Sequence, residues 1–206
     1  GLKLDGERTL ILVDRSGSML DDTIVNIIRR RNMSTEEQLR SVKWRQVVAT
    51  VDWLTAQIRP GTQYQIYMYN NTVEPVIRGS DGTWLTADDN TQLDEAVRVL
   101  RGTVPRNGTN LRGAFEAARQ LEPRPDNIIL IADGLPTMDD VATNRRTITG
   151  RQRVRLFQQA LRELPGGVPV NVLLYPLEGD YEAPILYWVL GYESGGSMIS
   201  VSRDWP

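Results

Sequence analysis

Two short segments of this chain, Thr9–Val13 and Asn127–Ala132, are almost continuously apolar and show no alternation of polar and apolar residues. A strand with this pattern has both faces covered, which is typical of the central strands of a parallel sheet. Longer segments with apolar residues at helical spacing lie between such short runs. The sequence therefore predicts an α/β fold with a mostly parallel sheet.

Predicted strands and helices alternate along the chain. We expect strands at Thr9–Val13, Tyr64–Tyr69, Asn127–Ala132, Val168–Leu174 and Met198–Val201, and an antiparallel edge strand at Thr72–Arg78. Pro75 is tolerated in an edge strand. Helices are expected at Val47–Ile58, Leu93–Leu100, Leu111–Leu121, Val154–Leu164 and Ile185–Leu190. The expected architecture is a Rossmann-like, doubly wound, mostly parallel sheet of about six strands, with one antiparallel edge strand and helices on both faces.

The first long helix has a signal at each end. Ser34 and Glu37 have the spacing of a capping box, in which a serine and a glutamate satisfy the first free amides of a helix. Pro60 followed by Gly61 is a stop signal. The sequence therefore predicts one continuous helix that begins after Ser34 and ends before Pro60.

The length of 206 residues fits a single domain, 1–206, that would bury about 70% of its unfolded surface. The longest apolar runs are far too short to cross a bilayer, so this chain is not expected to insert into a membrane. The chain begins with Gly rather than Met. We therefore expect it to be a piece of a longer protein, whose targeting or anchoring segment would lie outside it.

The formal net charge of −2 gives no general basic field, so nucleic acid is not an expected partner. One local basic stretch is expected to be the solvated face of a helix or loop, with a partner-binding patch as the alternative. It holds Arg145, Arg146, Arg151, Arg153 and Arg155.

The chain has no Cys and no His. Disulfides, thiol catalysis, thiolate metal sites, a Ser-His-Asp triad and His-ligated zinc are therefore excluded. A metal bound by this chain must be held by oxygen atoms, which favours the hard cations Mg²⁺, Ca²⁺ and Mn²⁺.

Polar side chains follow two of the predicted strands and precede one predicted helix. Asp14, Ser16 and Ser18 come after the first strand, Asp133 follows the other apolar strand, and Thr109 stands just before the third helix. In an open parallel sheet, ligands bind where the carboxyl ends of strands meet, so we expect these side chains at one edge. Alternate side chains of an extended loop point the same way, so the first three can converge on one point.

Each of these clusters has a structural alternative. Asp133-Gly134 is a frequent turn dipeptide, and Thr109 could cap the helix that follows it. Asp, Ser and Gly after a strand are also common loop formers. Together, however, the five residues offer three hydroxyls and two carboxylates, which suits the preference of Mg²⁺ for about six oxygen ligands. The sequence therefore predicts a Mg²⁺ site, with Mn²⁺ or Ca²⁺ as alternative ions.

Four motifs of the chain are similar to those of a known family. They are Asp14-Arg15-Ser16-Gly17-Ser18-Met19, Gly108-Thr109-Asn110, Ala132-Asp133-Gly134 and Gly195-Gly196-Ser197. These motifs resemble the von Willebrand factor A domain and its metal-ion-dependent adhesion site, in the style of bacterial members. The resemblance implies that Ser16 and Ser18 bind the ion directly and that Thr109 binds it directly or through water. It also implies that Asp14 and Asp133 act through water.

The resemblance implies that the chain is a non-catalytic binding module. The ion in such a site keeps an open coordination position, which takes a carboxylate from an exposed Asp or Glu of a partner protein. Some bacterial members instead work with an AAA-type ATPase, which is the alternative partner. Bacterial members are often tethered to a membrane, so the resemblance implies an anchor outside this chain.

The chain departs from the family in two places. The segment Asp21–Met33 makes the connection after Met19 longer than usual, and it contains three consecutive arginines, 29–31. We expect a short helix that packs locally, with a role in partner choice as the alternative. Integrin-type members continue into a further helix whose displacement signals occupancy of the site, and no such helix is evident after Met198–Val201.

A Mg²⁺-dependent phosphoryl-transfer enzyme with Asp14 as the nucleophile is a further alternative. Such enzymes usually carry a second carboxylate two residues later, where this chain has Ser16, and a lysine near the phosphate. The only lysines are Lys3 and Lys43, and neither is placed for that role. The Gly-x-Gly-x-x-Gly motif of dinucleotide-binding folds does not follow the first strand. We therefore expect no enzymatic activity.

Overall fold

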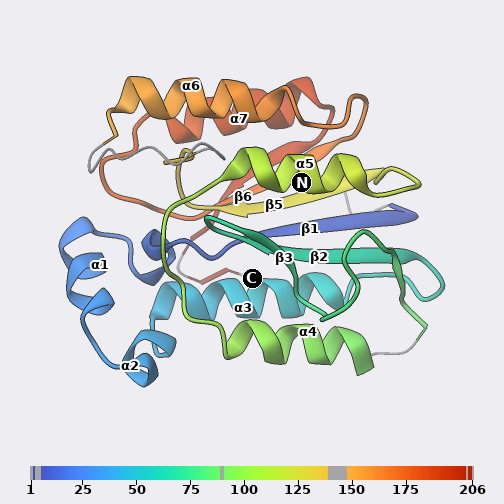
Figure 1. The fold of residues 1–206 in the computed structure, drawn as a ribbon, viewed down its shortest axis with the longest axis horizontal. Helices are drawn as coiled ribbons and strands as arrows, with labels where there is room; N and C mark the ends of the chain where they lie inside the picture. Colours follow the sequence, from blue (N-terminus) through green and yellow to red (C-terminus); the bar gives the residue numbers. More distant parts are fainter. Residues whose placement is uncertain (1, 3–5, 89–90, 139–147, 203, 206) are drawn as a thin grey trace.

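The computed structural model describes residues 2, 6–88, 91–138, 148–202 and 204–205. A central sheet lies between two layers of helices (Figure 1). Its strands are β1 (Arg8–Asp14), β2 (Gln63–Tyr69), β3 (Val73–Pro75), β4 (Leu85–Thr86), β5 (Asn127–Ala132), β6 (Val170–Leu174) and β7 (Ser197–Ser200). Their order across the sheet is β3-β2-β1-β5-β6-β7, and β4 also pairs with β2.

The sheet is parallel except at one edge. β1 pairs in parallel with β2 and with β5, and the parallel pairing continues through β6 to β7. The edge strands β3 and β4 run antiparallel to β2. Val13 stands opposite Ile131, so the loops that leave β1 and β5 begin side by side. The predicted doubly wound α/β fold is confirmed, and its strand order reverses between β1 and β5.

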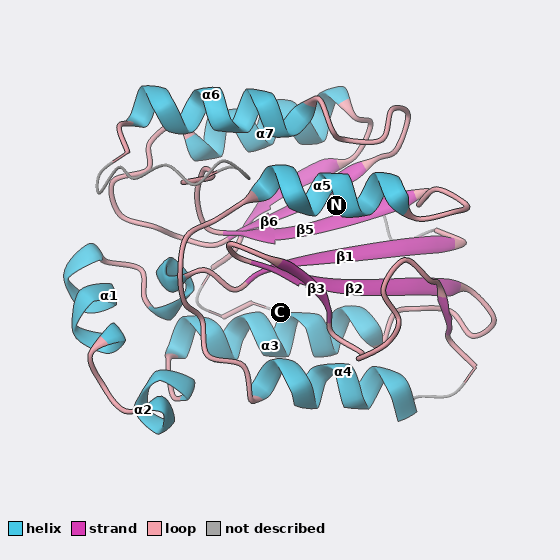
Figure 2. Cartoon of the chain, in the orientation of Figure 1, coloured by secondary structure: helices cyan, strands magenta, loops and turns pink. Residues whose placement is uncertain are grey.

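Helices cover both faces of the sheet (Figure 2). They are the 3₁₀-helix η1 (Gly17–Leu20), α1 (Ile24–Arg31), α2 (Thr35–Leu39), α3 (Val42–Thr55), α4 (Thr91–Arg101), α5 (Leu111–Gln120), α6 (Gly150–Leu161) and α7 (Ala183–Glu193). α3 and α4 pack on one face, and α5, α6 and α7 pack on the other.

The two helical layers explain why β1 is apolar at nearly every position. Successive side chains of a strand point to opposite faces of the sheet. Leu10 and Leu12 accordingly lie in the core beneath α5, α6 and α7, whereas Ile11 and Val13 lie in the core beneath α3 and α4. All four side chains are completely buried, and each buried side chain of this size stabilises the fold by roughly 1.5–3 kcal/mol.

The prediction of one continuous helix between Ser34 and Pro60 is wrong. The capping box of Ser34 and Glu37 is present, but it begins only the five-residue α2. A second cap, Ser41, then begins α3: its Oγ accepts a hydrogen bond from the Trp44 amide at 3.2 Å and donates to the Leu20 carbonyl at 2.5 Å. The bond from Ser41 to Leu20 joins residues far apart in sequence. Helical spacing alone therefore does not reveal that the helix is broken before Ser41.

The predicted edge strand, Thr72–Arg78, is shorter in the structure, where β3 covers only Val73–Pro75. The Val76 amide still donates to the Ile66 carbonyl of β2 at 2.8 Å, so one ladder bond follows Pro75 before the segment leaves the sheet. The two-residue β4, which pairs with Gln63 and Tyr64, was not predicted. A two-residue strand carries too little alternation to be seen in a sequence.

The long connection after β1 forms η1 and the short helix α1, as expected for a locally packed insertion. Of the basic stretch, Arg151, Arg153 and Arg155 lie on α6, whereas Arg145 and Arg146 lie outside the described residues. Among the residues described after β7, none is helical. Within the described part of the chain, no helix combines the length and apolarity needed to cross a membrane.

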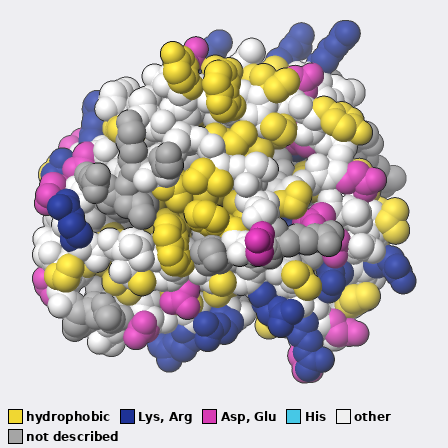
Figure 3. Space-filling model, turned by 180° about the vertical axis from the view of Figure 1, so that it is seen from behind, with side chains coloured by type: hydrophobic (Ala, Val, Ile, Leu, Met, Phe, Trp, Pro, Cys, Tyr) yellow, Lys and Arg dark blue, Asp and Glu magenta, His cyan; other side chains and the backbone are white. Residues whose placement is uncertain are grey.

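α7 carries several exposed apolar side chains. Ile185, Trp188 and Tyr192 are each more than half exposed, and the rings of the latter two stack at 5.6 Å. Hydrophobic side chains are also visible in several places on the rear face of the molecule (Figure 3). The outer side of α7 is therefore less polar than the solvent-facing side of a typical surface helix.

Candidate functional site

The structure places the five predicted site residues at the carboxyl edge of the sheet. Asp14 ends β1, Ser16 and Ser18 lie at the start of η1, and Asp133 directly follows β5. Thr109 lies in the loop before α5. All of them except Asp14 line one groove of about 600 Å³, which α1 and residues 177–179 also line. We call this cavity the site groove.

Hydrogen bonds connect four of the five residues. The Ser16 amide donates to Asp14 Oδ1 at 2.7 Å, and the hydroxyls of Ser16 and Ser18 lie 2.9 Å apart. Ser18 Oγ in turn donates to Asp133 Oδ1 at 2.9 Å. The side chains that alternate along the loop after β1 therefore converge, and they meet the carboxylate that follows β5.

Two backbone hydrogen bonds hold the loop of Thr109 beside the loop after β1. The Gly17 amide donates to the Asn107 carbonyl at 3.0 Å, and the Arg106 amide donates to the Arg15 carbonyl at 2.9 Å. These bonds position Thr109 at the site groove even though it is distant from Ser16 and Ser18 in sequence. Loop-to-loop bonds of this kind fix the relative position of polar side chains.

The alternative view of Thr109 as a helix cap is wrong. Asn110 caps α5, since its side chain accepts a hydrogen bond from the Gly113 amide at 3.0 Å. The Thr109 backbone instead contacts the loop after β5: its amide donates to Thr137 Oγ1 at 2.9 Å, and its carbonyl accepts from the Thr137 amide at 3.0 Å. Thr109 therefore connects the loop between α4 and α5 to the loop that follows β5.

Asp14 is completely buried, and its Oδ2 has no hydrogen-bond partner among the described residues. Burial, followed by the negative charge of Asp133, raises the pKa of Asp14 from its ordinary 3.8 to about 8. Hydrogen bonds from Ser16 and the charge of Lys43 lower that pKa only in part. A buried carboxylate with an open oxygen is stabilised by a nearby cation.

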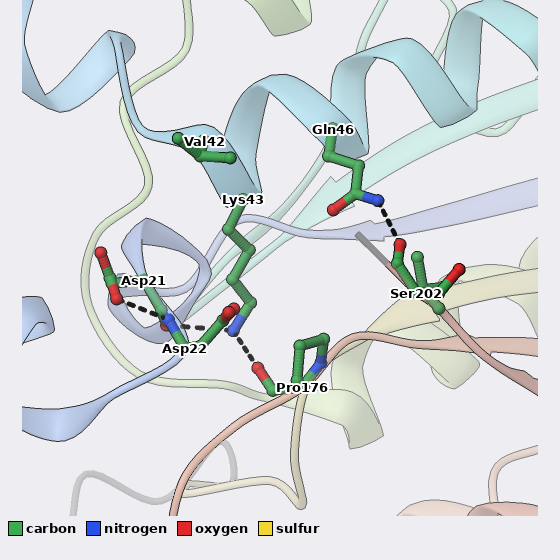
Figure 4. A pocket seen from close by; sticks show the side chains of 8 residues that line it. Asp21, Asp22, Val42, Lys43, Gln46, Pro176 and Ser202 are labelled. Carbon is green, nitrogen blue, oxygen red and sulfur yellow. Dashed lines mark hydrogen bonds between the residues drawn. The ribbon is translucent and has the colours of Figure 1, made fainter. Parts of the chain in front are cut away.

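Lys43, in the first turn of α3, is a site residue that the sequence analysis missed. Its Nζ donates to Asp133 Oδ2 at 2.8 Å. The same Nζ donates to the Pro176 carbonyl at 2.7 Å (Figure 4). It also lies 3.1 Å from the Asp21 carbonyl and 3.3 Å from the Ser18 carbonyl. The ammonium thereby joins the loops after β1, β5 and β6 at one buried point.

The sequence analysis considered Lys43 only as a possible phosphate-binding group and did not expect its bond to Asp133, while Lys3 lies outside the described residues. The sequence did carry a signal that Lys43 is buried. It stands four residues before Val47 and eight before Val51, which places it on the buried side of α3. A buried lysine on such a stripe needs a charged or polar partner. Its bonds to Asp133 and to carbonyl groups leave it unsuited to bind a substrate phosphate.

The oxygen donors of the site suit a hard divalent cation. Three hydroxyls and two carboxylates are oxygen donors of the kind that Mg²⁺, Mn²⁺ and Ca²⁺ prefer. No cluster of three Asp or Glu side chains fit to hold a metal exists in the part of the chain that the structure describes. A cation here would therefore depend on the hydroxyls of Ser16, Ser18 and Thr109 as well as on Asp14 and Asp133.

Three solved structures of similar fold cover almost all of this chain. A von Willebrand factor type A protein from Catenulispora acidiphila has a TM-score of 0.62 at 15% identity over 95% of this chain and 39% of its own. An aerotolerance-related membrane protein from Bacteroides fragilis has a TM-score of 0.55 at 16% identity, over 95% of this chain and 91% of its own. The PilB minor pilin from Streptococcus sanguinis has a TM-score of 0.58 at 14% identity, over 99% of this chain and 58% of its own.

These structures show the fold that the chain shares, and the chain spans less than two thirds of the first and third proteins. No curated protein sequence matches the chain. The sequence profile of the von Willebrand factor type A domain matches residues 9–135, more than half of the chain and the part that contains all five predicted site residues. The chain therefore belongs to the von Willebrand factor type A domain family.

Proposed function

We propose that this chain is a non-catalytic protein-binding module with a metal-ion-dependent adhesion site of the bacterial type. Mg²⁺ is the proposed ion, with Mn²⁺ or Ca²⁺ as alternatives, and the ligand is an exposed Asp or Glu of a partner protein. Domains of this family commonly mediate protein–protein interactions. Two observations carry the proposal together: Asp14 Oδ2 is buried with no hydrogen-bond partner among the described residues, and the hydroxyls of Ser16 and Ser18 converge at 2.9 Å in the same loop.

In this proposal each residue has a definite role. Ser16, Ser18 and Thr109 offer hydroxyl oxygens, and Asp14 and Asp133 offer negative charge. Bound among them, the cation supplies positive charge and an exchangeable coordination position for a carboxylate. Because the site lines an open groove, a side chain of another protein can reach it.

The charges of the buried residues favour capture of an anion once a divalent ion is present. Asp14 and Asp133 carry two negative charges when both are ionised, and Lys43 offsets one of them. A divalent cation then makes the site positive by one charge. Attraction between opposite charges is strong where water is largely excluded, as it is at the bottom of a groove.

An AAA-type ATPase as the partner remains an alternative that uses the same metal site, and it rests on the resemblance alone. The phosphoryl-transfer alternative is weaker because Ser16 stands where the second carboxylate would be and Lys43 is buried against Asp133. We therefore propose no catalytic residue. Asp14-dependent turnover of a phosphate ester would reverse this assignment.

Thermal unfolding tests the metal site. The melting temperature is measured with Mg²⁺, Mn²⁺, Ca²⁺ and EDTA for the unaltered chain, for Asp14→Ala and for the control Asp88→Ala, which changes an exposed carboxylate. An ion that binds only the folded state at a hundredfold excess over its Kd should raise the melting temperature by about 5–10 °C. Asp14→Ala should abolish the rise and Asp88→Ala should keep it. No shift with any of the three ions at millimolar concentration would refute the proposal.

A further inference from the structure

One wall of the site groove is the insertion helix α1. Ile24, Ile27, Ile28 and Arg31 line the groove. Their spacing of three, four and seven residues places them on one face of the helix. Ile27 is buried, but Ile24 is 50% exposed and Ile28 is 55% exposed. The insertion therefore presents apolar side chains, followed by an arginine, to the cavity that holds the candidate metal site.

Hydrogen bonds fix the start of α1 to residues 177–179, which also line the groove. Thr23 caps the helix, and the Ile24 amide donates to Glu178 Oε2 at 3.0 Å. The Glu178 amide donates to the Asp22 carbonyl at 2.8 Å, so the two segments hold each other from both sides. Leu177, beside Glu178, adds a further apolar side chain to the lining of the groove. The apolar side chains of α1 and Leu177 are therefore held in a fixed relative position in the lining of the groove.

Arg31 supplies a positive charge beside the metal-site loop. A Cβ atom built on Gly17, which lies between Ser16 and Ser18, would be 3.5 Å from Arg31 Nε and 3.7 Å from its Cζ. Arg30, by contrast, forms an ion pair with Asp21 at 2.9 Å. Within the described part of the chain, Arg31 pairs with no carboxylate.

The other charged side chains that line the groove already have partners. Arg153 lies 2.6 Å from Asp180 in an ion pair, and it also donates to the Leu135 carbonyl. The Glu178 carboxylate accepts from the first turn of α1. The guanidinium of Arg31 is therefore the charged group best placed to meet an anionic side chain that enters the groove.

We propose that the site groove binds a protein segment in which an acidic residue is accompanied by a large apolar residue a few positions away. The acidic side chain is directed to the metal site and to Arg31, and the apolar side chain packs against Ile24, Ile28 and Leu177. The volume of about 600 Å³ can hold several side chains. This inference rests on the proposed function and adds to it the sequence chemistry of the partner.

A displayed peptide library tests the inference. Each peptide carries one fixed Glu with random flanks, is retained on the immobilised chain in Mg²⁺ and is eluted with EDTA. The retained peptides should be enriched in Leu, Ile, Met or Phe at a constant distance from the Glu. Each selected peptide should lose binding when its Glu is replaced by Gln.

Paired variants of α1 assign the preference to its residues. The double variant Ile24→Ser, Ile28→Ser should bind a selected peptide about tenfold more weakly and should select peptides with no apolar preference. Arg31→Gln should also weaken the binding of the selected peptide about tenfold. The controls Val25→Ser and Arg29→Gln change exposed α1 side chains that do not line the groove, and they should bind as the unaltered chain does.

The outcomes separate this inference from the proposed function. Retention that needs Mg²⁺ and Glu, but shows no apolar preference, would overturn the inference and leave the proposed function intact. Absence of any EDTA-eluted peptide, together with no metal-dependent melting shift, would overturn both. Equal effects of Ile28→Ser and Val25→Ser would also contradict the assigned groove, and unchanged melting temperatures of the variants would exclude unfolding as the cause.

Discussion

Lys43 Nζ lies 2.8 Å from Asp133 Oδ2, and the two side chains are only 3% and 2% exposed. The pair links the first turn of α3 to the loop after β5, so a helix that contributes no predicted ligand still orients the candidate metal site. Ser18 occupies the other oxygen of the same carboxylate. The orientation of Asp133 is therefore set from two sides by residues of this chain.

Lys43→Met should destabilise the protein by about 3–5 kcal/mol, because it leaves Asp133 buried without its partner. Urea unfolding measures the loss. The control Arg98→Met removes an exposed ion pair with Glu95 and should cost less than about 1 kcal/mol. Adding Asp133→Leu to Lys43→Met should recover part of the stability, since no unpaired charge then remains. A loss of stability below about 1 kcal/mol for Lys43→Met would contradict the conclusion that Asp133 depends on Lys43 as its buried partner.

The stability of the metal-free chain should fall as pH rises between the two pKa values of Asp14. The folded state holds this proton up to a pKa of about 8, whereas the unfolded state releases it near 3.8. The folded state binds more protons in this window, so the free energy of unfolding decreases with pH and then levels off above the folded pKa. Asp14→Asn should remove this part of the pH dependence, and the exposed Asp88→Asn should retain it.

Metal binding should show the opposite dependence. A ligand carboxylate must lose its proton, so the rise in melting temperature caused by Mg²⁺ should grow as pH increases towards the Asp14 pKa of about 8. Melting curves with Mg²⁺ and with EDTA at several pH values measure the difference. A metal-dependent shift of constant size across this window would argue against Asp14 as a participant.

Ser41→Ala should destabilise the protein by about 1–2 kcal/mol, because it removes the cap of α3 and the hydrogen bond to the Leu20 carbonyl. The matched variant Ser34→Ala removes the exposed cap of α2 and should cost less, since that helix buries no residue completely. Urea unfolding of both variants gives the comparison. A larger loss for Ser34→Ala would contradict the assignment of Ser41 as the junction between η1 and α3.

Gly196→Ala should destabilise the protein by about 3 kcal/mol or more, because an added Cβ would lie 2.1 Å from the Val170 carbonyl oxygen. The contact is with backbone of the neighbouring strand β6, so no side chain can move aside. Gly166→Ala is the control, since a Cβ there meets nothing within 4 Å. Equal melting temperatures for the two variants would contradict the close approach before β7.

Much of the fold was predictable because its signals are local. The apolar run Asn127–Ala132 matches β5 residue for residue, and helical spacing located α4, α5, α6 and α7 to within a few residues. The carboxyl-edge rule for parallel sheets then led to Asp14 and Asp133, because adjacent strands end at the same edge.

The remaining features depend on contacts between distant segments. The break before α3 follows from the bond between Ser41 and the Leu20 carbonyl. The role of Lys43 follows from four acceptors that lie in the three segments after β1, β5 and β6. Arg31 lies close to Gly17 on a helix whose first turn is bonded to Glu178, a residue far along the chain. No local pattern of residues in the sequence encodes these contacts between distant segments.

Binding of Mn²⁺ measured by electron paramagnetic resonance tests the metal site most directly, because the signal of free Mn²⁺ falls as the ion binds. The chain should bind Mn²⁺ at one site, Mg²⁺ should displace it, and the double variant Ser16→Ala, Ser18→Ala should lose the binding. Ser200→Ala, which changes an exposed serine at the end of β7, should bind as the unaltered chain does. A free Mn²⁺ signal that the chain does not reduce, or that the double variant reduces equally, would contradict the proposed site.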